Sequence, residues 1–314
     1  MGECLRFPFT SREAPYVIGC GLVLSSRRIH GGGMVLYKYL TPARLDVLER
    51  RRIRFTQPAA FNDPFEFKPY IESAASQDHL REYVEQNFDE ILSRELKEYP
   101  ILSKLLPGES AIDLLRPLKS CIPGLFQLME PHFLPGVSTA INSALNANVG
   151  VLCLSEIRDS LLMWGHYTDN HEGFVIGFDQ NHPFFSMRRG PEDEFGFLRQ
   201  VKYCHSRPRV TMANTTGTEW FETKSDEWAY EKEWRMMRVL QDAESRLEGV
   251  PHPICLYGFP ADAVVEIVAG LRSSPELRDR LRTMSKGYPK AKLFQAQEHS
   301  SEYALLLKAE SPLS

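Results

Sequence analysis

The stretch VGVLCLSEIRDSLLMWGHYTDNHEGFVIGF, residues 149–178, contains two strand patterns with a helical pattern between them. Its ends, residues 149–154 and 174–178, are short runs of β-branched, aliphatic and aromatic residues, which are typical of buried strands. Residues 159–169 carry apolar side chains at helical spacing. A strand-helix-strand unit fits several fold classes, so the segments on either side decide between them.

Those flanking segments do not alternate regularly between helix and strand. Residues 77–147 have a helical pattern with breaks at Pro100, Pro107 and Pro123, whereas the sequence after residue 178 is mostly strand-like. Further strands are predicted at residues 35–39, 53–56, 198–204, 234–240, 254–257, 264–269, 291–294 and 303–307, and further helices at 41–52 and 275–286.

This order argues against a doubly wound parallel sheet. We therefore predict an α+β fold with a mixed or antiparallel sheet core and an α-helical insertion at about residues 77–147. Residues 34–314 are expected to form a single α+β domain. Residues 1–33, which end in three consecutive glycines, are expected to form an N-terminal arm.

The composition is that of an ordinary globular protein. Among 314 residues, 43% are hydrophobic and 25% are charged, which is enough to build a sizeable core. The net charge of −4 supplies no long-range field for nucleic acid or an acidic membrane. The six cysteines include no C-x-x-C pair, and the longest apolar run near the start, residues 17–24, is too short to span a bilayer. We expect a cytoplasmic protein without membrane association.

The motifs of several large enzyme classes are missing. The sequence contains no G-x-G-x-x-G, G-x-x-x-x-G-K-[ST], G-x-S-x-G or H-E-x-x-H pattern. Dinucleotide-fold, P-loop, serine-hydrolase and zincin functions therefore lose their usual support.

Glu231 and Glu233 are the strongest candidates for chemistry. If strand pairing begins there, their two carboxylates point to one face, where they can stabilise a cationic sugar transition state or accept a proton. The alternative is a solvated strand edge in which Lys232 and Arg235 are the charge partners.

Two other polar stretches also allow a purely structural role beside a functional one. Asn62-Asp63-Pro64 predicts an Asx-type turn, beside which Glu66 can pair with Lys68. The helix at 159–169 groups four side chains that form either the wall of a pocket or part of the core. These are Met163, Trp164, His166 and Tyr167. His166 and His171 are metal ligands only if the chain turns sharply between them, and no metal site is expected.

These stretches together resemble a bacterial family, domain-of-unknown-function family 2971. The resemblance covers about residues 35–240 and implies no established reaction. It rests on Tyr37-Lys38-Tyr39, Asn62-Asp63-Pro64-Phe65-Glu66, Leu154-Ser155-Glu156, Met163-Trp164-Gly165-His166-Tyr167, His171-Glu172-Gly173 and Trp228-Ala229-Tyr230-Glu231-Lys232-Glu233-Trp234-Arg235.

A weaker resemblance is to the ADP-ribosyltransferase-like fold. In that family an Arg or His on the first core strand, a Ser, Thr or Tyr in the middle and a late Glu bind NAD. Lys38 stands at the first position here, Ser155 or Tyr167 at the second, and Glu231-Lys232-Glu233 is similar to the acidic motif. The resemblance implies that Glu233 stabilises the oxocarbenium-like state and that Glu231 serves the acceptor. Lysine is a point charge without planar donors, so it suits a phosphate better than the same ribose contacts.

The second resemblance implies an NAD-consuming, ADP-ribosyltransferase-like enzyme that acts in bacterial defence or as a toxin, with a protein or nucleic acid as acceptor. Glu233 and Glu231 would be catalytic and NAD the substrate. The nucleotide would be bound by Tyr37, Lys38, Tyr39, Asn62, Ser155, Trp164, His166 and Tyr167. Two alternatives remain open: a non-catalytic module that binds a nucleotide or a protein, and a metal-dependent nuclease or hydrolase using Asp63, Glu66, His166 and Glu231.

Overall fold

The computed structural model describes residues 33–98, 108–191, 193–215, 217, 219–249 and 252–310. The predicted N-terminal arm lies outside the described residues except for Gly33. In the described part of the chain the helices and strands form an α+β fold with a mixed sheet core, which confirms the predicted class.

The largest sheet has eight strands within the described residues, in the order β15-β14-β13-β5-β1-β4-β10-β6. Neighbouring strands are antiparallel, except that β13 and β14 are parallel. The strands are β1 (Val35–Leu40), β4 (Val149–Ser155), β5 (Phe174–Asp179), β6 (Leu198–Gln200), β10 (Glu233–Val239), β13 (Val264–Ala269), β14 (Lys292–Glu298) and β15 (Leu305–Ala309).

Three smaller sheets surround the large one in the described residues. In one of them β12 (Ile254–Gly258) lies between β2 (Arg52–Phe55) and β11 (Ser245–Leu247) and pairs with both. The other two pair β3 (Tyr70–Ser73) with β8 (Arg209–Thr211) and β7 (Lys202–Cys204) with β9 (Thr223–Ser225). The prediction of a single strand at 198–204 is therefore wrong. The chain leaves β10 after Gln200 and pairs with β9 from Lys202 on, a change of partner that a local apolar pattern does not encode.

Two of the short helices differ in length from the predicted ones. The segment predicted at 41–52 is a 3-10 turn, Pro42–Arg44, followed by α1 (Asp46–Arg50), which ends because Arg51 takes a left-handed conformation with φ of 51°. Helix α6 (Leu161–Tyr167) begins at the N-cap Ser160. It stops before Asp169, Asn170 and His171, all of which have positive φ. Helix α8 (Pro275–Ser285) agrees with its prediction and has Ser274 as N-cap.

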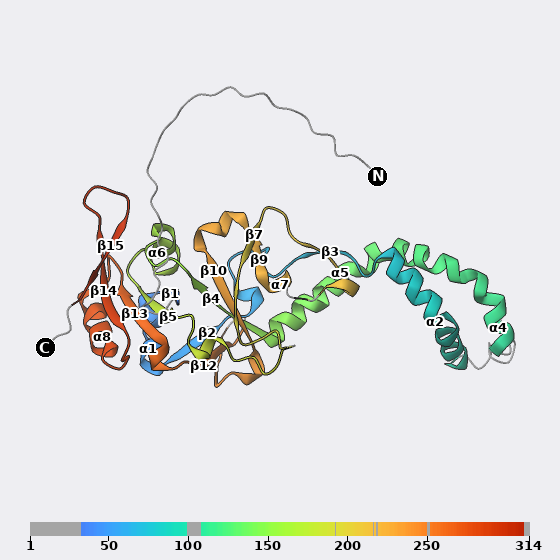
Figure 1. Cartoon of the computed structure of the whole chain (residues 1–314), viewed down its shortest axis with the longest axis horizontal. Helices are drawn as coiled ribbons and strands as arrows, with labels where there is room; N and C mark the ends of the chain where they lie inside the picture. Colours follow the sequence, from blue (N-terminus) through green and yellow to red (C-terminus); the bar gives the residue numbers. More distant parts are fainter. Residues whose placement is uncertain are drawn as a thin grey trace, which may run out of the picture.

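The segment predicted as a helical insertion is helical where the structure describes it. Helices α2 (Gln77–Glu98), α4 (Gly108–Leu115) and α5 (Ile122–Asn148) extend away from the sheets as an arm (Figure 1). Pro123 does not break this arm, because it lies in the first turn of α5, where a missing N–H is tolerated. The C-terminal part of α5 returns to the sheets, where Ile141 and Leu145 pack on the core.

Alternation along the strands divides the core between the two faces of the large sheet. One face buries Leu36, Leu152, Ile176 and Met236 with the side chains of α1, β2, β12 and α8. The opposite face carries two separate apolar clusters, one around Tyr37, Tyr39 and Trp164 and the other around Val151, Phe221 and Met237. Because side chains alternate along a strand, those of residues 153, 233 and 235 point to this second face. These polar side chains lie between its two apolar clusters.

No helix in the described residues has the length and apolar character needed to cross a membrane.

Candidate functional site

The large sheet opens between two of its inner strands, β1 and β4. In the described residues, β1 pairs with β4 only through Tyr37 opposite Ser155. Farther along β4, Val151 forms a bridge with Thr56 after β2 instead. The two strands therefore separate on the side of Lys38, and a cavity of about 120 Å³ lies there.

Eight of the ten predicted site residues line this cavity, which we call the Lys38 cavity. They are Tyr37, Lys38, Tyr39, Asn62, Ser155, Tyr167, Glu231 and Glu233. They come from β1, β4, β10, α6, the loop after β2 and the 3-10 turn Asp226–Glu231. The convergence is a result of the topology, because these segments are far apart in the sequence.

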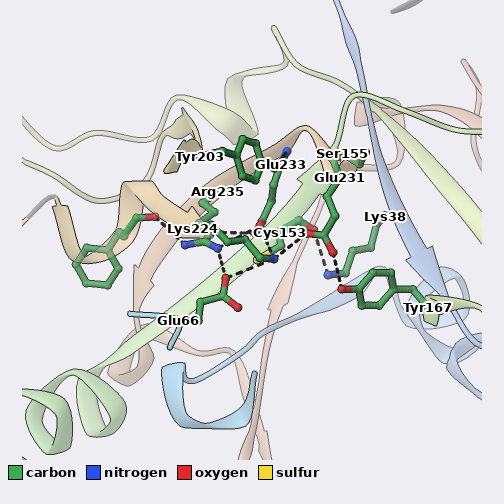
Figure 2. A network of polar contacts seen from close by, with 11 residues as sticks. Lys38, Glu66, Cys153, Ser155, Tyr167, Tyr203, Lys224, Glu231, Glu233 and Arg235 are labelled. Carbon is green, nitrogen blue, oxygen red and sulfur yellow. Dashed lines mark hydrogen bonds and ion pairs between the residues drawn. The ribbon is translucent and has the colours of Figure 1, made fainter. Parts of the chain in front are cut away.

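Glu231 and Glu233 lie on the same side, as predicted, but not at a solvated edge. Each residue is only 4% exposed. The ammonium of Lys224 bridges them, with Nζ 2.7 Å from Oε2 of Glu231 and 3.0 Å from Oε2 of Glu233 (Figure 2). Between them Lys232 takes a left-handed conformation with φ of 42°, which turns the chain from the 3-10 turn into β10. The alternative of a solvated strand edge is therefore wrong, although one of its two expected charge partners, Arg235, does contact Glu233.

Arg235 completes the buried charged cluster. Its Nε lies 2.8 Å from Oε1 of Glu233, its Nη2 lies 3.1 Å from Oε2 of Glu233, and Nη2 also binds Oε1 of Glu66. Nη1 donates to the carbonyl of Phe221 at 3.0 Å. The side chains of Arg235 and Glu66 are fully buried, so both charges depend on their partners in the cluster.

The cluster contains three carboxylates and two cations, and its groups differ in acidity. Although burial opposes ionisation of Glu233, Arg235 and Lys224 lower its pKa to about 2. Burial outweighs the same two cations at Glu66 and raises the pKa of that carboxyl to about 7. The three carboxylates raise the pKa of Lys224 despite its burial. With Glu66 protonated, two carboxylates balance two cations.

Glu231 has a different environment from Glu233. Its Oε1 accepts a hydrogen bond of 2.6 Å from the hydroxyl of Tyr167, a neutral donor. Burial and the nearby charge of Glu231 raise the pKa of Tyr167, which keeps the phenol protonated. Ser155 fixes the backbone here, because its hydroxyl donates to the Glu231 carbonyl at 2.5 Å and accepts from the Ile157 amide. Tyr167 and Ser155 thus both hold Glu231 in place.

Lys38 on β1 spans the opening between the strands to reach β4. Its Nζ donates to the carbonyl of Cys153 at 3.1 Å, which leaves further donors on the ammonium group. Hydrogen bonds fix the two neighbouring tyrosines: the hydroxyl of Tyr37 donates to Glu266, and that of Tyr39 donates to the carbonyl of Ile157. Cys153 itself remains a thiol, because burial and the charge of Glu233 raise its pKa.

Trp164 and His166 are not among the residues that line the Lys38 cavity. Trp164 is fully buried in the core, where its Nε1 donates to the carbonyl of Arg158, so at this position the core alternative holds. His166 lies exposed on α6. His171 stacks on the Trp164 ring and forms part of the turn into β5, since the Arg272 amide donates to its carbonyl.

The loop after β2 agrees with one prediction and contradicts another. Oδ1 of Asp63 accepts from the Phe65 amide at 2.9 Å, which is the predicted Asx turn. Glu66 does not pair with Lys68, however. Its carboxylate points inward to Arg235 and Lys224, while the ammonium of Lys68 donates to the carbonyl of Pro64.

The residues of the alternative metal site are not brought together. Glu231 lines the Lys38 cavity, whereas Asp63 and Glu66 line a neighbouring one, and His166 is exposed. In the part of the chain that the structure describes, no group of three or more His, Cys, Asp and Glu residues is arranged to hold a metal ion.

Sequence reasoning missed the central cation of the cluster. Lys224 lies on β9, seven residues before Glu231, and belongs to a different sheet from β10. Tyr203 on β7, whose hydroxyl accepts from the Glu233 amide at 2.8 Å, was also missed. The acidic excess around residues 219–233 was the available signal, since buried carboxylates need cationic partners.

Residues 163–236 match the family DUF2971, described as a protein of unknown function. This confirms the predicted resemblance over that range, which is shorter than the predicted 35–240. The DUF2971 range runs from α6 into β10 and contains the charged cluster except for Glu66: Tyr167, Lys224, Glu231, Glu233 and Arg235. No curated protein and no solved structure matches the chain significantly.

Proposed function

We propose that the protein is an enzyme that cleaves the bond between nicotinamide and ribose in NAD or a related nucleotide, and that the reaction takes place in the Lys38 cavity. The observation that carries the proposal is convergence. Lys38, Tyr167 and the two glutamates come from separate segments, yet they line one cavity. A cation, two carboxylates and aromatic side chains are the kinds of group that bind the charged and aromatic parts of a nucleotide, and a cavity of about 120 Å³ holds one such part.

In the proposed reaction the bond between ribose C1′ and the nicotinamide nitrogen breaks, and its electron pair goes to the nitrogen. Positive charge develops on the ribose as neutral nicotinamide leaves, and a carboxylate in the cavity stabilises this charge. Water or an acceptor then forms the new bond to C1′ and gives its proton to the carboxylate. With water, the products are ADP-ribose, nicotinamide and a proton.

The surroundings of the two carboxylates support assigning the substrate-facing role to Glu231 rather than to Glu233. Both oxygens of Glu233 contact cations, which weakens their attraction for another positive charge. Glu231 has one oxygen bound to the neutral phenol of Tyr167. In this proposal Glu231 is the catalytic residue, and Glu233 is a positioning residue that holds Lys224.

Lys38 is proposed to bind the pyrophosphate. Its ammonium lines the same cavity as Glu231 and has donors beyond the one that contacts Cys153. Replacing Lys38 with Met keeps much of the apolar stem and removes the charge. We expect K38M to raise KM for NAD at least tenfold with a smaller change in kcat, because binding is weakened more than bond cleavage.

The test is nicotinamide release from NAD by the purified protein, with and without cell lysate as a source of acceptors. Release by the wild type with a higher KM in K38M supports the proposal. Absence of release from folded protein in both conditions, at NAD concentrations that produce a thermal shift, contradicts it.

The second candidate is a module that binds a nucleotide without turnover. It is favoured by one observation: the carboxylates of Glu231 and Glu233 are already in contact with Lys224. This alternative predicts a ligand-induced thermal shift that K38M reduces, with the nucleotide recovered intact after long incubation.

A further inference from the structure

A second cavity of about 450 Å³ lies on the other side of Lys224 from the Lys38 cavity. Two loops form its walls, one after β2 with Phe65 and Lys68 and one between β7 and β8 with Arg207, and β9 forms its floor. We call it the Arg207 cavity. Lys224 lines both cavities, whereas Glu66 lines only this one.

The rim of the Arg207 cavity carries two cations whose charges are not neutralised. Nζ of Lys68 donates to the carbonyl of Pro64 at 2.9 Å, and Nη1 of Arg207 lies 3.5 Å from the carbonyl of Lys68. In the described part of the chain, neither side chain forms an ion pair with a carboxylate. Two adjacent, exposed cations at the mouth of a cavity favour an anionic ligand, and a guanidinium beside an ammonium suits phosphate oxygens.

An aromatic ring stands beside these cations. Phe65 is 63% exposed, an unusual position for a large apolar side chain, and the Arg207 guanidinium lies 5.9 Å from its ring centroid. An exposed ring next to cations provides a surface on which a base can stack while its phosphate is held nearby.

The floor of the cavity holds a polar atom without a partner. Oε1 of Glu66 binds Arg235 and lies 3.6 Å from Nζ of Lys224, but Oε2 is buried and forms no hydrogen bond in the described structure. A buried carboxylate oxygen without a donor is costly. This oxygen has no contact with solvent, and the raised pKa of Glu66 reduces the cost by favouring the neutral carboxyl, so the exposed cations and ring are the groups that can contact a ligand.

We propose that the Arg207 cavity binds a nucleoside phosphate, with the phosphate at Lys68 and Arg207 and the base on Phe65. The ligand is a free nucleotide or the phosphorylated end of a nucleic-acid strand, since both carry this chemistry. The site is separate from the Lys38 cavity, so this proposal does not depend on NAD cleavage.

The test measures binding by calorimetry, with AMP, adenosine, inorganic phosphate and a 5′-phosphorylated pentanucleotide as probes. We expect AMP to bind more tightly than adenosine or phosphate alone, because each of these lacks half of the contacts. R207Q and F65A should each lower the affinity for AMP at least fivefold. Two matched controls, R81Q on α2 and Y303A in the loop before β15, alter exposed side chains of the same kind elsewhere and should change nothing.

Two results would overturn the proposal: AMP affinity that R207Q and F65A leave unchanged, or AMP binding that is lost in K38M and retained in R207Q, which would place the nucleotide in the Lys38 cavity. Affinity for the pentanucleotide at least tenfold above that for AMP, lost in R207Q, identifies the strand end as the ligand. The reverse order identifies the free nucleotide. Because no turnover is measured, a failure here is distinguishable from a failure of the proposed reaction.

Discussion

Arg235 is the residue on which the buried cluster depends most. Its guanidinium is fully buried and binds both Glu233 and Glu66. R235M removes this charge and leaves two buried carboxylates with Lys224 as their remaining cation. We expect the free energy of unfolding to fall by about 3–5 kcal/mol, measured by urea denaturation. The control is R209M, which breaks an exposed pair with Glu72 and should cost little. Equal losses in the two variants would contradict this account of the cluster.

Glu66 should make stability depend on pH near neutrality. Its pKa rises from an ordinary value of 4.5 to about 7, mainly through burial, so between these values the folded state binds more protons than the unfolded state. Stability conferred by this group is therefore fully present below pH 4.5 and is lost as the pH rises through 7. Glu233 acts in the opposite direction: with its pKa lowered to about 2, its contribution is lost as the pH falls below 4.5.

The variant E66Q isolates this effect, because glutamine remains neutral. Between pH 5 and 8, the free energy of unfolding of the wild type should fall relative to that of E66Q by a few kcal/mol and should level off above about pH 7. Urea denaturation at four pH values is sufficient. Parallel pH profiles for the two proteins would show that Glu66 is ionised throughout this range.

Single residues also show what could be predicted from the sequence. Spacing predicted that Glu231 and Glu233 share a side, and both contact Lys224. Spacing also allowed a solvated edge, which is wrong, because the loop carrying Glu66 and the strand carrying Lys224 cover the two carboxylates. No local pattern in the sequence encodes contacts between such distant segments.

Among the secondary-structure elements, the turn between α6 and β5 gives a structural role to the motif His171-Glu172-Gly173. In His171-Glu172-Gly173, the backbone of Gly173 donates to Thr168 and accepts from Gly270, which ties β5 to the end of β13. A Cβ at Gly173 would lie 2.1 Å from the carbonyl oxygen of Leu40, so only glycine fits this close approach of backbones.

G173A should therefore destabilise the protein by about 3 kcal/mol, because the neighbouring atoms belong to the backbone and cannot move aside. G165A, in the adjacent helix α6, is the matched control: nothing lies within 4 Å of the added Cβ, and alanine is the better helix former. Thermal unfolding of both variants checks the prediction. It fails if G173A melts at the same temperature as G165A.

Helices and strands with a clear residue pattern could be predicted from the sequence. The points at which the chain changes from one pairing strand to another could not. Strands β1, β4, β5, β10, β12 and β13 lie within a residue or two of their predicted positions, since they are rich in the β-branched, aliphatic and aromatic residues that favour strands. The split of residues 198–204 into β6 and β7 was missed, because both halves have strand character and only their partners differ. Helix α6 was predicted too long because three consecutive left-handed residues end it.

In the molecule as a whole, the site exists because the large sheet separates between β1 and β4. β1 and β4 share one pair, Tyr37 and Ser155, and the cavity opens beyond it. Of the ten residues that the sequence singled out, eight line this cavity. It did not predict the opening itself, because the pairing of strands about 110 residues apart, across a helical arm, depends on tertiary contacts.

The central claim is that Glu231 faces the substrate in the Lys38 cavity. The most direct measurement is the initial rate of nicotinamide release from NAD by E231Q compared with the wild type, with the fold of both proteins checked by circular dichroism. The glutamine keeps the shape of the side chain and removes the negative charge. We expect kcat to fall at least a hundredfold with little change in KM. Release at the wild-type rate by folded E231Q would contradict the claim.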